Sequence, residues 1–149
     1  MSNEGQVTIR RVVPGDAEAV AELNGQLGYP ATVEETRQRI EALDGQNGVR
    51  AVLVACLGDE VSGWVDVALS FHLQSPEYAL IGGLVVKDGM RGLGIGRRLC
   101  EEAEAWGREK GVLRIRVTSR STRTDAHRFY LRDGYAEVKT SRVFEKLLT

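Results

Sequence analysis

The sequence contains few of the residues that bind metals or form disulfides. It has two cysteines and two histidines among 149 residues, and no C-x-x-C pair. Structural zinc sites and redox motifs depend on such clusters. We therefore expect no metal site, and we expect Cys56 and Cys100 to be buried thiols rather than a disulfide. Free thiols make a reducing cytoplasm the default location.

The chain also lacks an excess of charge of either sign and a long apolar run. Lysine and arginine number 20 and aspartate and glutamate 21, so the formal net charge is −1. Binding of nucleic acid through its phosphates needs a basic surface, and we expect no nucleic-acid partner. No apolar run is long enough to cross a bilayer, and the polar residues 2–6 do not resemble a signal peptide. We therefore expect no membrane partner.

A glycine-rich stretch in the second half of the chain is the most informative part of the sequence. An apolar run over residues 81–86 ends in a polar turn, and glycines follow at alternate positions, Gly92, Gly94 and Gly96. From Ile95 onward the apolar spacing is helical. A strand, a glycine loop and a helix N-terminus in this order direct backbone N–H groups toward one point. That arrangement is suited to holding phosphate oxygens.

The spacing of these glycines excludes two nucleotide-binding motifs. The triphosphate loop requires a glycine followed by Lys-Ser or Lys-Thr, which does not occur here. The dinucleotide fingerprint G-x-G-x-x-G fails because its third glycine falls on Arg97 or Leu99. What remains is R-x-x-G-x-G, formed by Arg91, Gly94 and Gly96. A glycine turn that binds no ligand is the alternative at this point.

The apolar patterns along the chain predict a mixed α/β fold. Their order is β, α, α, β, β, β, α, β, α, β, without repeats or linkers, so we expect a single domain over residues 1–149. The crossover through the glycine-loop helix should make strands 78–86 and 112–118 parallel neighbours, while hairpins make the other pairs antiparallel. Residues 136–148 are predicted to form the last strand or a strand pair.

Short motifs predict where some of these elements begin or bend. Thr32 and Glu35 form a capping box for the second helix, and Asp16 is a suitable N-cap for the first. Gly82 and Gly83 interrupt an otherwise apolar strand. They indicate a β-bulge, or a place where a ligand or another backbone comes close.

A second motif, in the last third of the chain, makes the function more specific. Residues 126–135 read A-H-R-F-Y-L-R-D-G-Y. This resembles the signature A-x-x-F-Y-x-x-x-G-[FY] of the GNAT superfamily of N-acetyltransferases. The R-x-x-G-x-G loop is similar to the coenzyme A pyrophosphate loop of the same superfamily, [RQ]-x-x-G-x-[GA]. The two motifs stand in the expected order, and the resemblance spans nearly the whole chain.

The resemblance implies both a fold and a donor site. The fold would be a GNAT-like α/β (α+β) fold, with a mostly antiparallel sheet, one parallel strand pair and helices on both faces. Acetyl-CoA would be the cosubstrate, with no metal. Its pantetheine arm would pair with backbone groups along strand 78–86, and its pyrophosphate would bind the loop N–H groups. The residues implied to bind the donor are Leu84, Val85, Val86, Arg91, Gly92, Leu93, Gly94, Ile95, Gly96, Arg97 and Arg123.

Two positions depart from the family pattern. Arg123 stands where many members have an asparagine that contacts pantetheine, so it would reach a CoA phosphate or simply be exposed. Leu80 stands where many members have the glutamate that acts as general base. We take Glu77 as the first candidate for that base. Asp66, His72 and a water relay are the alternatives.

The activity implied by the resemblance is acetyl transfer from acetyl-CoA to a primary amine. The amine would attack the thioester directly, with no acyl-enzyme. The acceptor, a small-molecule or peptide amine, is not identified by either motif. Two alternatives remain: a non-catalytic acyl-CoA-binding or sensing module, and a protein or tRNA acetyltransferase. A homodimer is suggested by family analogy alone.

Tyr130 is the residue implied to protonate the departing CoA thiolate as the general acid. Phenols have an ordinary pKa of about 10 and hold their proton at neutral pH. The alternative is that Tyr130 only packs beside Phe129. We predict that Tyr130→Phe lowers kcat roughly tenfold or more and leaves CoA binding nearly unchanged. Steady-state kinetics and CoA titration test this, and an unchanged kcat would remove Tyr130 from the mechanism.

Overall fold

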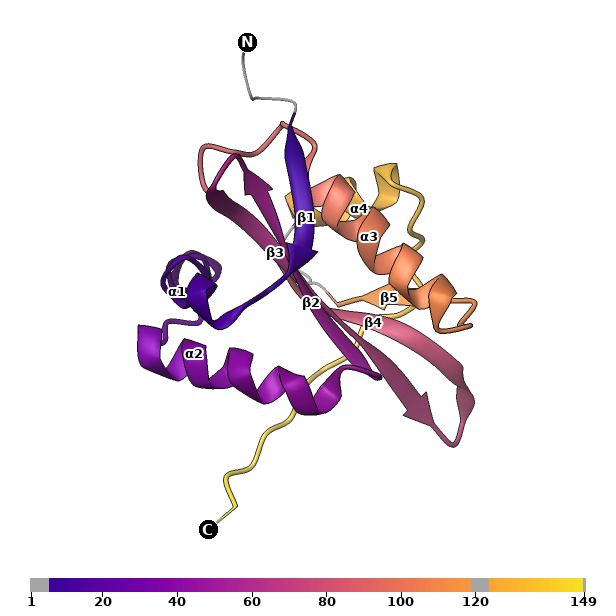
Figure 1. The fold of residues 1–149 in the computed structure, drawn as a ribbon. Helices are drawn as coiled ribbons and strands as arrows, with labels where there is room; N and C mark the ends of the chain where they lie inside the picture. Colours follow the sequence, from indigo (N-terminus) through magenta and orange to yellow (C-terminus); the bar gives the residue numbers. More distant parts are fainter. Residues whose placement is uncertain (1–5, 119–123, 149) are drawn as a thin grey trace. The chain divides into compact units, whose positions relative to one another are not determined.

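The computed structural model describes residues 6–118 and 124–148. They fall into two compact units, Met1–Val117 and Thr118–Thr149, and each is described by itself. The first contains the sheet and helices α1 to α3, and the second contains α4 (Figure 1). The single domain expected over residues 1–149 stays a prediction. Within the described ranges, no helix combines the length and apolar character needed to cross a bilayer.

One five-stranded sheet is the framework of the first unit. Its strands lie in chain order: β1 Val7–Arg11, β2 Arg50–Leu57, β3 Glu60–His72, β4 Ser75–Val86 and β5 Ile115–Val117. Neighbouring strands are antiparallel except β4 and β5, which are parallel. A helix connects that parallel pair, as such a crossover requires. The predicted mixed sheet with one parallel pair is confirmed.

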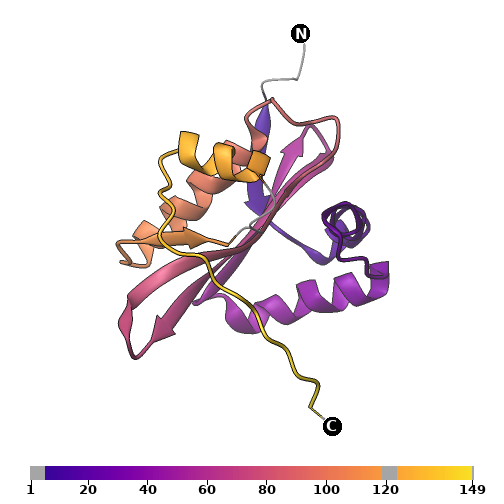
Figure 2. The same ribbon diagram turned by 180° about the vertical axis from the view of Figure 1, so that it is seen from behind.

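Helices cover both faces of this sheet, as predicted (Figure 1 and Figure 2). Helices α1 (Ala17–Leu27) and α2 (Val33–Ala42) lie on one face, and α3 (Ile95–Glu109) lies on the other. Short 3₁₀ turns, Pro14–Asp16 and Leu43–Gln46, precede α1 and follow α2. The sheet therefore separates two apolar layers.

Each layer is filled by side chains that alternate along the strands. Against α1 and α2, the sheet contributes Val54, Val61 and Val85, which pack with Leu23 and Ile40. Against α3, the absence of a side chain at Gly63 brings that strand close to Leu99 and Ile95. Cys56 and Cys100 are both buried free thiols, which confirms that prediction.

Both predicted helix starts are confirmed, but only one of the two N-cap residues caps its helix through its side chain. The capping box at α2 is confirmed, because Glu35 N donates to Thr32 Oγ1 at 3.0 Å and Thr32 N donates to Glu35 Oε1 at 2.9 Å. Asp16 precedes α1, but its side chain does not cap that helix. Its carboxylate instead accepts two bonds from Arg10, at 2.8 and 2.9 Å, and one from Val13 N at 2.9 Å.

The bulge predicted at the paired glycines is confirmed in β4. Asp66 of β3 is opposite Gly83, and the next residue of β3, Val67, is opposite Ile81, so Gly82 is the extra residue. Pairing with β5 reaches only as far as Ile81, which is opposite Val117. Residues 82–86 thus extend β4 beyond its described pairing with β5.

The prediction of a strand over residues 136–148 is wrong. Within these described residues the structure has no strand, and their apolar side chains, such as Val143 and Phe144, are exposed. A strand exists only where another strand accepts and donates its hydrogen bonds, and the second unit contains α4 (Thr124–Arg132) but no described strand. The strand predicted at 112–118 is shorter in the structure, Ile115–Val117.

The contact between Gly83 and Trp64 gives a stability prediction. A Cβ on Gly83 would lie 2.6 Å from Trp64 Cη2, and the indole is partly buried against α1 and cannot swing away freely. We expect Gly83→Ala to lower the free energy of unfolding by about 1–3 kcal/mol, as overpacking does. Gly82→Ala is the matched control, because a Cβ there meets nothing within 4 Å. Urea denaturation measures both, and equal losses would contradict the prediction.

Candidate functional site

The glycine loop between β4 and α3 has a backbone that only glycine adopts readily. Gly89, Gly92 and Gly94 have φ of 86°, 86° and 80°, in the left-handed region. A Cβ at any of these positions would meet nothing within 4 Å, so conformation rather than space requires glycine. Gly94 is also the N-cap of α3, so the loop leads directly into the positive end of a helix dipole.

Three arginines surround this loop, but they are held differently. Arg91 pairs with Asp88 at 3.3 Å and Arg97 with Glu101 at 3.1 Å, and both arginine side chains are 69% exposed. Such surface pairs contribute little stability, so either guanidinium can turn toward an anion. Arg98 instead donates to the Val7 carbonyl, which ties α3 to β1. Arg91 and Arg97 are therefore the mobile cations of the loop.

The outer edge of β4 offers backbone groups beside the same loop. Lys87 N donates to Ser62 O at 2.8 Å, so the backbone of Lys87 faces β3. Backbone groups alternate between the two edges of a strand. Val85 therefore also faces β3, whereas Leu84 and Val86 face the opposite edge. Past Ile81 no described strand pairs with that edge, and a strand-like ligand has room to bind there.

Gln26, which no sequence motif singles out, is bonded to the end of this edge. Its Nε2 donates to Val86 O at 2.7 Å, and its Oε1 accepts from Asp88 N at 2.8 Å. Gln26 lies on α1, 60 residues before Val86 in the chain. No motif or periodicity connects a single helical glutamine with a strand end that far away, so the sequence contains no signal for it.

The predicted catalytic residues fall in different parts of the structure. Glu77 is an exposed residue of β4 in the first unit, and Tyr130 is a half-buried residue of α4 in the second. The Tyr130 ring makes edge contacts with Phe129 and Tyr135, at centroid distances of 5.3 and 5.7 Å. Arg123 lies outside the described residues. The roles given to Tyr130, Glu77 and Arg123 stay predictions.

The two alternative bases both have close partners. Asp66 accepts from Arg50 Nη1 at 2.6 Å, so a guanidinium already neutralises its charge. His72 Nε2 lies 2.9 Å from Ser70 Oγ, and its ring stacks on Tyr78. Within residues 6–118 and 124–148, no cluster of three histidine, cysteine or acidic side chains is arranged to bind a metal.

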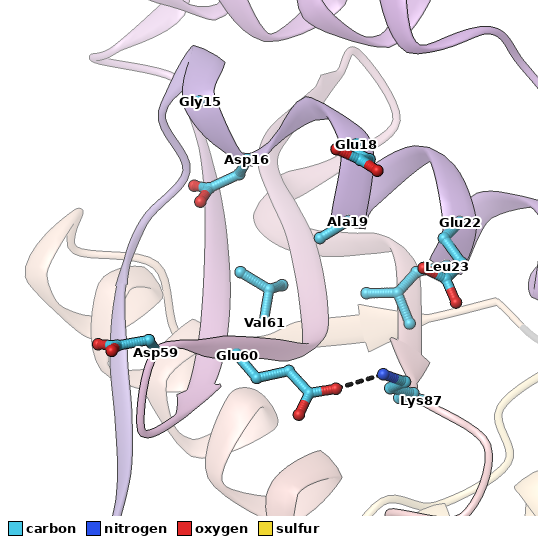
Figure 3. A pocket seen from close by; sticks show the side chains of 10 residues that line it. All are labelled: Gly15, Asp16, Glu18, Ala19, Glu22, Leu23, Asp59, Glu60, Val61 and Lys87. Carbon is cyan, nitrogen blue, oxygen red and sulfur yellow. Dashed lines mark hydrogen bonds and ion pairs between the residues drawn. The ribbon is translucent and has the colours of Figure 1, made fainter.

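A hollow of about 350 Å³ has Lys87 among its lining residues but none of the glycine loop (Figure 3). The start of α1, the β2–β3 turn and Lys87 line it. Its charged residues are Asp16, Glu18, Glu22, Asp59, Glu60 and Lys87. The Glu60 carboxylate binds the Lys87 ammonium and raises its pKa. Residues 91–97 lie outside this lining, so the hollow is distinct from the predicted pyrophosphate loop.

Comparison with known proteins gives consistent matches. A model described as the acetyltransferase (GNAT) family matches residues 18–135. The chain is 30% identical over 137 residues to aminoglycoside N(6')-acetyltransferase type 1 of Stenotrophomonas maltophilia, covering 89% of this chain and 88% of that one. It is 38% identical over 85 residues to aminoalkylphosphonate N-acetyltransferase of Salmonella typhimurium, and this match spans 56% of the chain and 55% of that relative.

The fold is also that of solved acetyltransferase structures. Aminoglycoside N-acetyltransferase AAC(6')-Iy, in a structure with CoA, has a TM-score of 0.82 and 18% identity, over 94% of each chain. At this identity the likeness establishes the fold alone. Together with the parallel β4–β5 pair, it confirms the predicted mixed α/β architecture.

The buried carboxylate beside the hollow gives a pH prediction. The bonds from Arg10, and the one from Val13 N, hold the pKa of Asp16 below its ordinary value. A lowered folded-state pKa contributes stability above the unfolded pKa, and this is lost as pH falls through the folded one. We expect Asp16→Asn to be about 1–3 kcal/mol less stable at pH 7.

The stability gap between the two proteins should narrow below about pH 4, because the unfolded wild-type chain then takes up a proton at Asp16 while the folded protein does so only at lower pH. Urea denaturation of both proteins over a pH series measures this difference in the free energy of unfolding. Asp59→Asn is the matched control, since Asp59 is an exposed carboxylate at the same hollow. A stability difference that stays constant down to acid pH would contradict the conclusion that the ionised Asp16 carboxylate stabilises the fold.

Proposed function

The chain is an N-acetyltransferase of the GNAT family, and we propose that it transfers acetyl from acetyl-CoA to a primary amine by direct attack. The amine nitrogen forms a bond to the thioester carbon, and the carbon–sulfur bond breaks. The amine loses one proton and the CoA thiolate gains one. No acyl-enzyme forms, because the thioester already has a good leaving group.

The observation that carries this proposal is the continuity between the open edge of β4 and the glycine loop. The outward backbone groups of Leu84 and Val86 suit the amides of a pantetheine arm, which carry the same donors and acceptors as a strand. The loop that follows, with Arg91, Arg97 and the N-terminus of α3, suits a pyrophosphate. CoA contains both groups in this order. Leu93, Ile95 and Gly96 complete the loop around that anion.

Catalysis in this proposal comes mainly from placement. Holding the amine against the thioester replaces a bimolecular encounter by a local one. A backbone N–H near the bulge would stabilise the developing oxyanion. We assign Tyr130 as the general acid that protonates the thiolate and Glu77 as the first candidate for the base. Arg123 would add a contact to the CoA.

The acceptor proposed is a small-molecule amine, with a peptide amine as the second choice. Two relatives are named as an aminoglycoside and an aminoalkylphosphonate acetyltransferase, and both of these acceptors are small amines. The two classes differ in charge, since an aminoglycoside carries several cationic amines whereas a phosphonate places an anion near the amine. The homodimer and the cytoplasmic location stay predictions.

The test is acetyl transfer by the purified full chain over a panel of amines. We expect thiol release from acetyl-CoA that depends on the added amine, together with an acetylated product in the mass spectrum. The panel contains an aminoglycoside, an aminoalkylphosphonate and a short peptide with a free amine. Tight CoA binding without turnover on any amine would support the sensing module instead. Absence of CoA binding would overturn the proposal.

A further inference from the structure

Gln26 holds the end of β4 through both atoms of its amide. The half-buried side chain donates from Nε2 to Val86 O at 2.7 Å, and its Oε1 accepts from Asp88 N at 2.8 Å. Val86 is the last residue of β4, and Asp88 stands at the start of the turn into the glycine loop. One side chain of α1 thus brackets the connection between strand and loop.

These two bonds have the pattern of a strand pair. In an extended chain the C=O of one residue and the N–H of the second residue after it point to the same edge. The Gln26 amide, with one donor and one acceptor, pairs with Val86 and Asp88 as a peptide of a neighbouring strand would. It supplies a rung of the ladder on the outer edge of β4, where that strand ends.

The other edge is held just as firmly at the same place. Lys87 N donates to Ser62 O at 2.8 Å, and the Lys87 ammonium pairs with the Glu60 carboxylate. Ser62 and Glu60 are both residues of β3. Met90 N then closes the turn on Lys87 O at 3.0 Å. The peptide around Lys87 is therefore bonded from both sides before any ligand binds.

The next rung along the outer edge, toward the bulge, consists of Leu84 C=O and Val86 N–H. Gln26 already binds the last pair of groups, Val86 C=O and Asp88 N–H. A strand-like ligand can therefore pair with this edge only from Val86 N–H toward Gly82. We infer that Gln26 is a positioning residue for the donor. It closes the outer edge of β4 at Val86 and so sets the register in which a pantetheine arm pairs with Leu84 and Val86. This inference rests on the proposed use of acetyl-CoA.

The expected effect of Gln26 is on donor binding rather than on chemistry. With the Lys87 peptide already ordered, a donor spends no binding free energy on fixing the strand end or the first turn of the loop. Without Gln26, binding of acetyl-CoA must order that turn. The Val86 carbonyl, left without its partner, can also accept a hydrogen bond from the ligand and so shift the register of pairing. The acceptor and the transfer step are not addressed by either bond.

The test compares Gln26→Met with Gln38→Met in the full chain. Methionine keeps the length of the side chain and removes both hydrogen bonds. Gln38 is an exposed α2 residue whose side chain donates to Glu34 Oε1 at 3.4 Å, on a different helix from Gln26, which makes it a matched control. We expect Gln26→Met to raise the Kd for CoA and the KM for acetyl-CoA about tenfold, the ratio equivalent to about 1.4 kcal/mol. The kcat at saturating donor should change by less than about twofold, and Gln38→Met should change none of these values.

Gln26→Glu tests the bond to Val86 O separately from the bond to Asp88 N. It also provides a second variant if Gln26→Met does not fold. A carboxylate still accepts from Asp88 N but repels the Val86 carbonyl. We expect its Kd for CoA to rise at least as much as that of Gln26→Met. A glutamate variant that binds CoA like the wild type would show that the Val86 rung is not needed, and would overturn the inference.

Thermal unfolding distinguishes positioning from a purely structural role. A methionine variant that melts earlier but binds CoA normally at a temperature well below its transition would overturn the inference. A fall in kcat with unchanged Kd would overturn it as well. If the wild type itself does not bind CoA, the proposed function fails and this inference with it. If the wild type binds and transfers acetyl but Gln26→Met does so equally, only the inference fails.

Discussion

Strand β4 pairs with β3 along one edge, whereas within the described residues only part of its other edge has a strand partner, and the rest of the first unit is arranged around that difference. It pairs with β3 over nearly its whole length but with β5 only as far as Ile81. Backbone N–H and C=O groups need partners when they leave water. Among the described residues that edge has no strand partner past Ile81, so a ligand with peptide-like groups has room to pair there.

The surroundings keep this edge open without letting the strand move. The bulge at Gly82 changes the course of β4 where β5 stops, and Trp64 lies over the space left by Gly83. Behind the strand, α1 contributes to the core and also provides Gln26 at its end. At the loop, the dipole of α3 and two weakly held arginines favour an anion. The proposed binding edge and the proposed anion-binding loop thus share one support.

Local signals in the sequence predicted much of this arrangement. The capping box of α2, the bulge and the glycine loop each depend on residues within a few positions of one another. The predicted strand at 136–148 failed because a strand needs a partner. Asp16 is the N-cap residue of α1, as predicted, but its carboxylate binds Arg10 and Val13 N instead of an N–H group of the helix. For the candidate site, the loop was predictable, but Tyr130, Glu77 and Arg123 remain predictions that come from family resemblance.

By itself, the sequence determined the family, through two motifs that resemble those of GNAT acetyltransferases, and it predicted the glycine loop, because such motifs, glycine spacing and helix starts are encoded in short segments. Only the tertiary structure decided which edge of β4 is open, which way Leu84 and Val86 face, and that Gln26 closes the end of that edge. The first two features follow from the pairing of β4 with β3 and β5, and the bonds of Gln26 join residues that are 60 and 62 positions apart. No short-range pattern records such contacts, because they arise only when α1 has packed on the sheet.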